Sequence, residues 1–340
     1  MVGESLGVID KARPILLIIA IACGLSFGIL LPQLIMNWFA NIVYVSLIAL
    51  VYSLALGVPF GDVARSFANL RFFTIAWLTN FLFVPLVAFS LALIFLGPYP
   101  AIFVGFILYS IAPCTDWFLI FTAMAKGDVC LGLALLPTNL ILQVILIPIY
   151  LFLFAGLIVP FQISSLIETL LVFIVLPFAL AAITRWIIRK TRTKEWKAKV
   201  IEKTLPNMQI TILVVIIFFM FAEQAETITG NIGPLSIIFV PTILLFCTAF
   251  AITQLVSRKM KLKYGECALL SFTTIARNSP IGLAIAVGLF PTQPLIQAAI
   301  IIPEIIELPV LLLLVRLLAV IRSRFYRTDN LTSTNSARTK

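Results

Sequence analysis

Four ionisable residues lie deep inside long hydrophobic stretches of this sequence: Asp116, Arg277, Glu304 and Glu307. A charged group at the centre of a lipid bilayer is costly unless it is paired or hydrated, and such groups commonly serve ion, proton or substrate pathways. These four side chains are therefore candidates for binding a polar solute or carrying a proton. A buried ion pair that only fixes helix packing is the alternative interpretation.

The composition indicates that the hydrophobic stretches lie in a membrane. Of the 340 residues, 62% are hydrophobic and 11% are charged, whereas soluble domains have about 45–50% and about 25%. The chain has no histidine, which excludes histidine-based catalysis and histidine ligation of metal or haem. Its five cysteines form no CxxC pair, so we expect neither a zinc site nor a disulfide framework, and no cofactor.

Hydrophobic runs separated by charged or turn residues predict an all-α integral membrane protein with ten transmembrane helices. Further spans follow the first run, and no small-residue cleavage site stands out after it. We therefore do not expect this run to be a cleaved signal peptide. The expected helices cover residues 14–31, 34–57, 70–97, 100–125, 130–158, 164–189, 205–222, 234–257, 265–290 and 294–318.

The basic residues predict the orientation of these helices. Apart from Arg277, every one of the 24 Lys and Arg residues falls before helix 1, in alternate loops, or at the end of helix 10 and in the tail. The positive-inside rule then places both termini in the cytoplasm and the protein in the cell membrane. The net charge of +10 is therefore a topology signal, and we expect no nucleic-acid partner.

The ten helices divide into two halves of five, residues 1–160 and 161–327, followed by a polar tail, 328–340, that we expect to be disordered and cytoplasmic. An odd number of helices in each half gives the two halves opposite orientations in the membrane. Secondary transporters are often built from such inverted repeats, with the binding site at the midplane between broken helices.

The fourth helix of each half contains a proline within a polar cluster. Residues 109–117 include Pro113, and residues 273–282 include Pro280. Proline interrupts a helix, and unwound backbone at this depth is tolerated only where it lines a cavity or is buried in protein. We therefore expect both helices to be broken there, with the binding site between the breaks.

Motifs at these positions resemble those of arsenite efflux permeases of the arsenical-resistance type, within the bile acid:sodium symporter superfamily. The similar segments are Ile111–Thr115 with Lys126–Asp128, Asn278–Ser279 with Leu283–Val287, and Ile306–Leu311. The resemblance covers nearly the whole chain. It implies ten helices in two inverted repeats, with helices 4 and 9 broken and crossing, and it implies secondary transport.

The sequence departs from the sodium-coupled members of that superfamily. Their Ser-Asn pair after the helix 4 break falls on Phe118 and Leu119, and their helix 9 glutamate and glutamine fall on Thr273 and Arg277. Two hydrophobic residues cannot coordinate sodium, and a guanidinium repels it. We therefore expect sodium-independent transport, with Arg277 as a built-in cation that an ion pair with Asp116 neutralises.

The resemblance assigns the substrate site to Cys114. Arsenous acid is neutral and its As(III) is thiophilic, so a thiol at the break is a suitable soft ligand. Position alone would favour Cys114 as a packing residue, as buried cysteines usually are. We expect Thr115, Asn278 and Ser279 to hydrogen-bond the As–OH groups.

The carboxylates of helix 10 are the expected proton carriers. Glu307 lies at the depth of Cys114 and within the matching motif, and Glu304 lies one turn away. The expected partners are thus a small-molecule substrate, protons and the lipid bilayer. The leading function is proton-coupled export of arsenite and antimonite, as an antiporter.

Other functions stay open at this stage. An organic-anion symporter of the same superfamily would use Arg277 to bind a carboxylate. An intramembrane enzyme has little support, because the sequence has no Ser/His or HExxH arrangement. A receptor or scaffold is a further alternative, against which the paired broken helices argue.

The expected orientation predicts which loops a membrane-impermeant thiol reagent reaches. In a variant without its exposed native cysteines, Glu223→Cys should react from outside intact cells, because the loop after helix 7 faces outward. Lys194→Cys should react only after the membrane is permeabilised. The reverse pattern would contradict the orientation.

Overall fold

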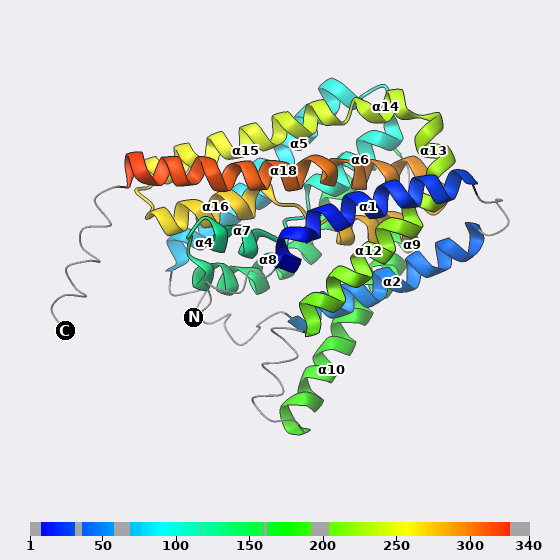
Figure 1. Cartoon of the computed structure of the whole chain (residues 1–340), viewed down its shortest axis with the longest axis horizontal. Coiled ribbons are helices and arrows are strands. Elements are labelled where there is room, and N and C mark those ends of the chain that lie inside the picture. The colour runs from blue at the N-terminus through cyan, green and yellow to red at the C-terminus, as the bar shows by residue number, and fades with distance from the viewer. Residues whose placement is uncertain are drawn as a thin grey trace.

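The computed structural model describes residues 8–30, 36–57, 69–115, 117–156, 158–159, 162–191 and 204–326. Asp116 and the expected tail, 328–340, lie outside the described residues. Within these ranges the regular elements are helices, as the composition predicts, and β-type pairing is limited to an isolated bridge. The helices form two groups that pack side by side (Figure 1).

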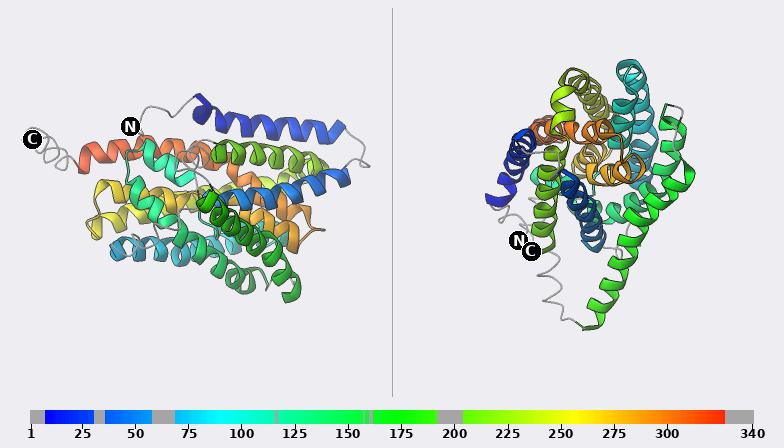
Figure 2. Two further views of the ribbon diagram at one scale, coloured as in Figure 1. Left: turned by 90° about the horizontal axis from the view of Figure 1, so that it is seen from below. Right: turned by 90° about the vertical axis from the view of Figure 1, so that its right-hand side faces the viewer.

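The smaller helix group contains four helical rods. They are α1 (Val8–Leu30), α2 (Met36–Gly57), α12 (Leu205–Glu223), and a continuous rod of α9 (Ile163–Leu170), a π-helical turn (Leu171–Val175) and α10 (Leu176–Thr191). Helix α12 packs between α1 and α2, and α2 packs on α10. The α9–α10 rod runs obliquely, and its α10 end projects from the bundle (Figures 1 and 2).

The larger helix group surrounds the two expected breaks. Its first part is α4 (Leu70–Leu78), a π-helical turn (Thr79–Phe83), α5 (Val84–Leu96), α6 (Pro100–Ser110), α7 (Trp117–Met124) and α8 (Val129–Tyr150), which a second π-helical turn extends to Ala155. Its second part is α15 (Phe239–Lys259), α16 (Tyr264–Ile275), α17 (Ser279–Leu289) and α18 (Pro294–Phe325). Short helices α13 (Ala225–Gly230) and α14 (Ile232–Ser236) connect the groups.

Five helical segments of the described chain are long and apolar enough to cross a bilayer: Leu70–Leu96, Val129–Ala155, Ile163–Ile188, Ile232–Lys259 and Pro294–Phe325. Shorter apolar helices occupy the other expected spans. Together with their hydrophobic, lipid-compatible surface these segments make a multi-pass membrane protein. Helix α18 continues seven residues beyond its expected end at residue 318, because a helix can extend past the apolar region that hydropathy detects.

Several of the basic loops meet at one end of the bundle. The Arg71 guanidinium donates to the Met260 carbonyl at 2.5 Å, the Arg322 guanidinium lies 5.0 Å from the centre of the Tyr264 ring, and the Tyr264 hydroxyl donates to the Ala125 carbonyl at 2.6 Å. These contacts join the ends of α4, α7, α15, α16 and α18, on the left in Figure 1. Arg71 and Arg322, two of the basic residues that sequence analysis assigned to one side of the membrane, thus lie at the same end of the bundle.

Glycines let α6 pack closely between α17 and α18. A Cβ at Gly105 would lie 2.5 Å from the Ile296 carbonyl oxygen and 2.5 Å from the Ala299 Cβ. A Cβ at Gly282 of α17 would lie 3.0 Å from the Leu108 carbonyl oxygen. The position of the α6 end, and so of the first break, depends on this close approach.

Enlarging Gly105 should separate α6 from α18. Because the new methyl group meets backbone and has no room, Gly105→Ala should lower the free energy of unfolding by about 1–3 kcal/mol. Gly233→Ala is the matched control, since no atom lies within 4 Å of the added Cβ. Thermal unfolding of the detergent-solubilised variants measures the difference, and equal midpoints would contradict the packing argument.

Candidate functional site

Both expected breaks are present and they lie against each other. Helix α6 ends at Ser110 and α7 begins at Trp117, while α16 ends at Ile275 and α17 begins at Ser279. Between these ends the two unwound segments run antiparallel to each other and form the isolated β-bridge between Pro113 and Arg277. The prolines that marked the breaks in the sequence lie at the bridge (Pro113) and in the first turn of α17 (Pro280).

Two backbone hydrogen bonds join the unwound segments. The Cys114 amide donates to the Ala276 carbonyl at 3.0 Å, and the Asn278 amide donates to the Ala112 carbonyl at 2.8 Å. Backbone groups released from a helix need new partners where water is absent. Each break therefore supplies the hydrogen-bond partners that the other lacks.

Arg277 lies where two helices end. Its Nη1 donates to the carbonyl of Ser110, the last residue of α6, at 3.0 Å, and its Nε donates to the carbonyl of Ile275, the last residue of α16, at 3.2 Å. Helix C-termini carry unsatisfied carbonyls and partial negative charge. The guanidinium, which is 2% exposed, neutralises both ends at once.

The third guanidinium nitrogen of Arg277, Nη2, has no hydrogen-bond partner among the described residues. The expected partner, Asp116, lies between Thr115 and Trp117 but outside the described part of the chain. The Arg277–Asp116 ion pair therefore stays a prediction. What the structure adds is that carbonyl oxygens already hold two of the three guanidinium nitrogens.

Glu307 links α18 to both breaks. Its Oε1 accepts a hydrogen bond from the backbone amide of Arg277 at 3.0 Å, and its Oε2 accepts one from the Tyr109 hydroxyl at 2.5 Å. Glu307 is 3% exposed. Glu304 lies one turn earlier on α18 and is half-buried. Glu307, one of the two expected proton carriers, is therefore in direct contact with the bridged segments.

The expected substrate residues also lie in the breaks. Cys114, Thr115, Asn278 and Ser279 are all buried. The Asn278 Nδ2 donates to the Thr115 Oγ1 at 3.3 Å, while its Oδ1 accepts from the first turn of α17. The Ser279 hydroxyl has no partner within the described chain. A thiol, two hydroxyls and an amide are thus gathered at one place.

The role of Tyr109 was not evident from the sequence. The residue stands at the start of the first polar cluster, but its hydroxyl gave no indication of a partner almost two hundred positions away. A phenol hydroxyl buried in an apolar helix needs a hydrogen-bond partner. That requirement was the available signal, and it could have suggested a carboxylate without identifying which one.

A second polar cluster beside the breaks was also missed. The side-chain amides of Asn80 and Asn139 each donate to the Thr273 hydroxyl at 3.2 Å. The side-chain oxygens of Asn80 and Asn139 have no hydrogen-bond partner among the described residues. The same holds for both polar atoms of the buried Gln143 side chain, one turn after Asn139 on α8. Thr273 is the residue that the sequence resemblance aligned with a glutamate of sodium-coupled symporters, and the side chains that meet at it here, those of Asn80 and Asn139, are uncharged.

The Lys126–Asp128 motif has a local structural role. Lys126 adopts a φ of 59°, and Asp128 caps α8 by accepting from the Leu131 amide at 2.9 Å. The Asp128 amide donates to the Gly265 carbonyl at 3.1 Å. This motif, which contributed to the resemblance, positions the α7–α8 turn against α16 rather than forming part of the site.

Comparison with known proteins identifies the family. The sequence model of the Sodium Bile acid symporter family matches residues 44–231, more than half of the chain. The protein belongs to this family. Its members are transporters rather than enzymes, and the resemblance inferred from the break motifs is confirmed.

Relatives of this sodium bile acid symporter family member match most of its length. The Arsenical-resistance protein Acr3 of Corynebacterium glutamicum is 23% identical, over 90% of this chain and 88% of its own. The Arsenical-resistance protein Acr3 of Alkaliphilus metalliredigens is also 23% identical, over 93% of this chain and 93% of its own. An uncharacterized transporter of Synechocystis sp. is 24% identical, over 93% of this chain and 89% of its own. At these identities the chain is a divergent member.

The contact between Tyr109 and Glu307 can be measured in a double-mutant cycle. Tyr109→Phe removes the donor to a buried carboxyl oxygen, so it should lower the free energy of unfolding by about 1–3 kcal/mol. In a Glu307→Gln background, Tyr109→Phe should lower the free energy of unfolding by clearly less, because the two residues are coupled.

Tyr52→Phe is the matched control for that cycle. The Tyr52 hydroxyl donates to Thr184 Oγ1 at 2.9 Å, away from the breaks. Its effect on unfolding should be the same with Glu307 or Gln at position 307. Strict additivity of the Tyr109 and Glu307 substitutions would show that the hydrogen bond does not contribute.

Proposed function

We propose that this protein exports arsenite, and antimonite by the same chemistry, from the cytoplasm in exchange for protons and without sodium. The observation that carries the proposal is the short connection between a thiol-bearing segment and a carboxyl group. The Cys114 amide bonds to Ala276, and the amide of the next residue, Arg277, bonds to Glu307. A change at the carboxyl group is thus transmitted directly to the segment that holds the thiol.

The chemistry at the breaks suits arsenous acid. A neutral solute can enter a buried site without a counter-ion, and a single thiol offers As(III) a soft ligand that still releases it. Thr115, Asn278 and Ser279 supply hydroxyl and amide groups for the three As–OH groups. The Ser279 hydroxyl has no other partner within the described chain.

The hydrogen bonds that hold Glu307 support proton coupling. As a carboxylate it accepts from both the Arg277 amide and the Tyr109 hydroxyl. Protonation turns one oxygen from an acceptor into a donor, so the Tyr109 hydroxyl would have to reorient. The link between α18 and the bridged segments would weaken, and Glu304 one turn away would provide a second proton site.

Sodium independence is supported by the position of the Arg277 guanidinium. A fixed cation already occupies the two helix C-termini that could otherwise attract a metal cation. The neighbouring Asn80–Asn139–Thr273 contacts bring together only uncharged groups. We propose that these features replace the sodium ion of related symporters.

We further propose ten transmembrane helices in two inverted halves, 1–160 and 161–327, in the cell membrane with both termini cytoplasmic. The antiparallel direction of the bridge between Pro113 and Arg277 supports opposite orientations of the two broken helices. The meeting of basic loops at one end of the bundle supports a single cytoplasmic side.

A second function is favoured by one observation. The Arg277 Nη2 has no partner among the described residues, and a guanidinium with a free edge could bind a carboxylate. Symport of an organic anion is therefore the alternative, and a direct Arg277–Asp116 pair would argue against it.

Transport into everted membrane vesicles tests the proposal. Arsenite uptake should depend on an imposed pH gradient and should be unchanged when K⁺ replaces Na⁺. Cys114→Ser keeps the size and hydrogen bonding of the side chain but removes the soft ligand, so it should reduce uptake at least about tenfold, the equivalent of 1.4 kcal/mol.

Cys267→Ser is the matched control, because Cys267 is also buried but lies in α16, outside the breaks. It should transport normally. Undiminished arsenite uptake by Cys114→Ser would overturn the assigned thiol. Absence of arsenite uptake together with uptake of an organic anion would support the alternative.

A further inference from the structure

Four polar side chains are buried together inside the larger helix group, beside the breaks. They are Asn80 in the π-helical turn after α4, Asn139 and Gln143 on α8, and Thr273 near the end of α16. Each is at most 1% exposed. We call these four residues the amide cluster. A π-helical turn inside a longer helix frequently accompanies a functional site, and this one carries Asn80.

The amide cluster has more hydrogen-bonding groups than its own members satisfy. The Thr273 hydroxyl accepts from the side-chain amides of Asn80 and Asn139, at 3.2 Å each. The side-chain oxygens of these asparagines and both polar atoms of Gln143 have no hydrogen-bond partner within the described chain. Exchanging O and N in either asparagine leaves the same number, because the hydroxyl engages only one end of each amide. Four buried polar atoms therefore need further partners.

The members of the cluster converge on one place. Asn80 and Asn139 reach the same hydroxyl from different helical rods, so their amide groups flank one oxygen atom. Gln143 follows Asn139 by four residues and lies on the same face of α8, about 6 Å further along the helix axis. A few small molecules at this place would contact all three amides.

The helices that supply the cluster bring no ionic group to it. The π-helical turn and α8 contain no charged residue, and α4 and α16 contain one each, Arg71 and Glu266, in their first turns. Both are hydrogen-bonded to groups outside the cluster. Beyond the end of α16, the buried guanidinium of Arg277 adds positive charge, which disfavours a metal cation nearby.

The unpartnered atoms require a ligand that both donates and accepts hydrogen bonds. The oxygens of Asn80, Asn139 and Gln143 need donors, whereas the Gln143 NH₂ group needs an acceptor. A metal cation would satisfy only the oxygens, and an anion only the NH₂ group. Water offers two donors and two acceptors, and a buried water molecule typically makes about three hydrogen bonds. The chemistry of the cluster therefore fits water.

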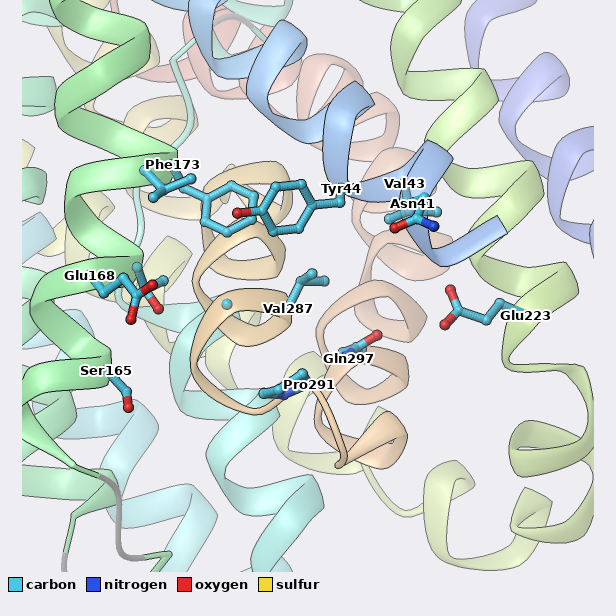
Figure 3. A pocket seen from close by; sticks show the side chains of 13 residues that line it. Asn41, Val43, Tyr44, Ser165, Glu168, Phe173, Glu223, Val287, Pro291 and Gln297 are labelled. Carbon is cyan, nitrogen blue, oxygen red and sulfur yellow. The ribbon is translucent and has the colours of Figure 1, made fainter. Parts of the chain in front are cut away.

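The amide cluster is separate from the cavity between the two helix groups. That cavity, of about 390 Å³, is lined from α2, α9, α12, α17 and α18 and carries the carboxylates of Glu168 and Glu223 (Figure 3). None of the four cluster residues lines it. The cluster belongs to the larger group alone.

We propose that the amide cluster binds ordered water molecules, which complete the hydrogen bonding of Asn80, Asn139 and Gln143. The water joins the π-helical turn, α8 and α16 at the place where the sequence resemblance aligns Thr273 with a glutamate of sodium-coupled symporters. The inference extends the proposed sodium independence by assigning the site to a neutral ligand. It does not depend on which substrate is transported.

Replacing Gln143 with methionine, which has a similar size, tests for the water. If water bonds to the side chain, Gln143→Met should lower the thermal unfolding midpoint of the detergent-solubilised protein by at least about 2 °C. In a dry site the same change would remove two unsatisfied polar atoms and raise the midpoint. Gln254→Met is the matched control for a glutamine bonded directly to protein, since its Nε2 donates to the Ser271 hydroxyl at 2.9 Å. A raised or unchanged midpoint for Gln143→Met would overturn the proposal.

Radiolytic labelling of the unchanged protein detects the water directly and covers the case that Gln143→Met does not fold. X-ray irradiation of bound water produces hydroxyl radicals, which oxidise the side chains beside it. Leu140 is 1% exposed and lies between Asn139 and Gln143 on α8, whereas Ile300 of α18 is 0% exposed and serves as the control. Oxidation of Leu140 should be at least about fivefold faster than that of Ile300, because only Leu140 adjoins the hydrated cluster. Equal rates would overturn the proposal.

The dependence of stability on salt distinguishes water from a cation. A cation that binds the folded protein raises the unfolding midpoint as its concentration rises. The midpoint should therefore agree within about 1 °C in NaCl, KCl and choline chloride at equal ionic strength. A rise specific to sodium or potassium would overturn the water assignment, and a rise specific to sodium would also contradict the proposed sodium independence. If the water tests fail while vesicles transport arsenite without sodium, this inference is wrong and the proposed function stands.

Discussion

The pairing of two unwound segments is the interaction on which the rest of this structure depends. A helix interrupted inside a bilayer exposes amides and carbonyls that lipid cannot satisfy, and each such group costs several kcal/mol. Here the Cys114 and Asn278 amides bond to carbonyls of the opposite segment, so neither break could persist without the other. The close packing of α6 on α17 and α18, made possible by Gly105 and Gly282, holds the segments in register.

Charge at the breaks follows the helix ends. Arg277 donates to the last carbonyls of α6 and α16, where two helix dipoles place partial negative charge. Glu307 accepts from the Arg277 amide rather than from its guanidinium, so the acid is tied to the backbone and not only to a side chain. Under the proposed function, protonation of Glu307 would therefore act directly on the backbone of the bridged segments.

The two helix groups meet along α17, which runs from the breaks to the contact with α9. Its first residue, Ser279, belongs to the break, and Gly288 near its end lies against Thr169 of α9. Helix α17 also packs on α2 of the smaller group and on α6 and α18 of the larger group. Contacts at both ends of α17 thus tie the breaks to the packing between the two helix groups.

The sequence by itself determined the membrane class, most span limits and both breaks, because hydropathy and proline act locally along the chain. For example, the expected transmembrane helices 70–97 and 205–222 correspond to the observed helical segments Leu70–Leu96 and Leu205–Glu223. It also identified Arg277 and Glu307 as buried ionisable residues. Only the tertiary structure decided their partners: the hydroxyl of Tyr109, the terminal carbonyls of two helices, and the amides around Thr273. Such contacts join residues that are distant in the chain, and their choice depends on how helices pack, which no local pattern records.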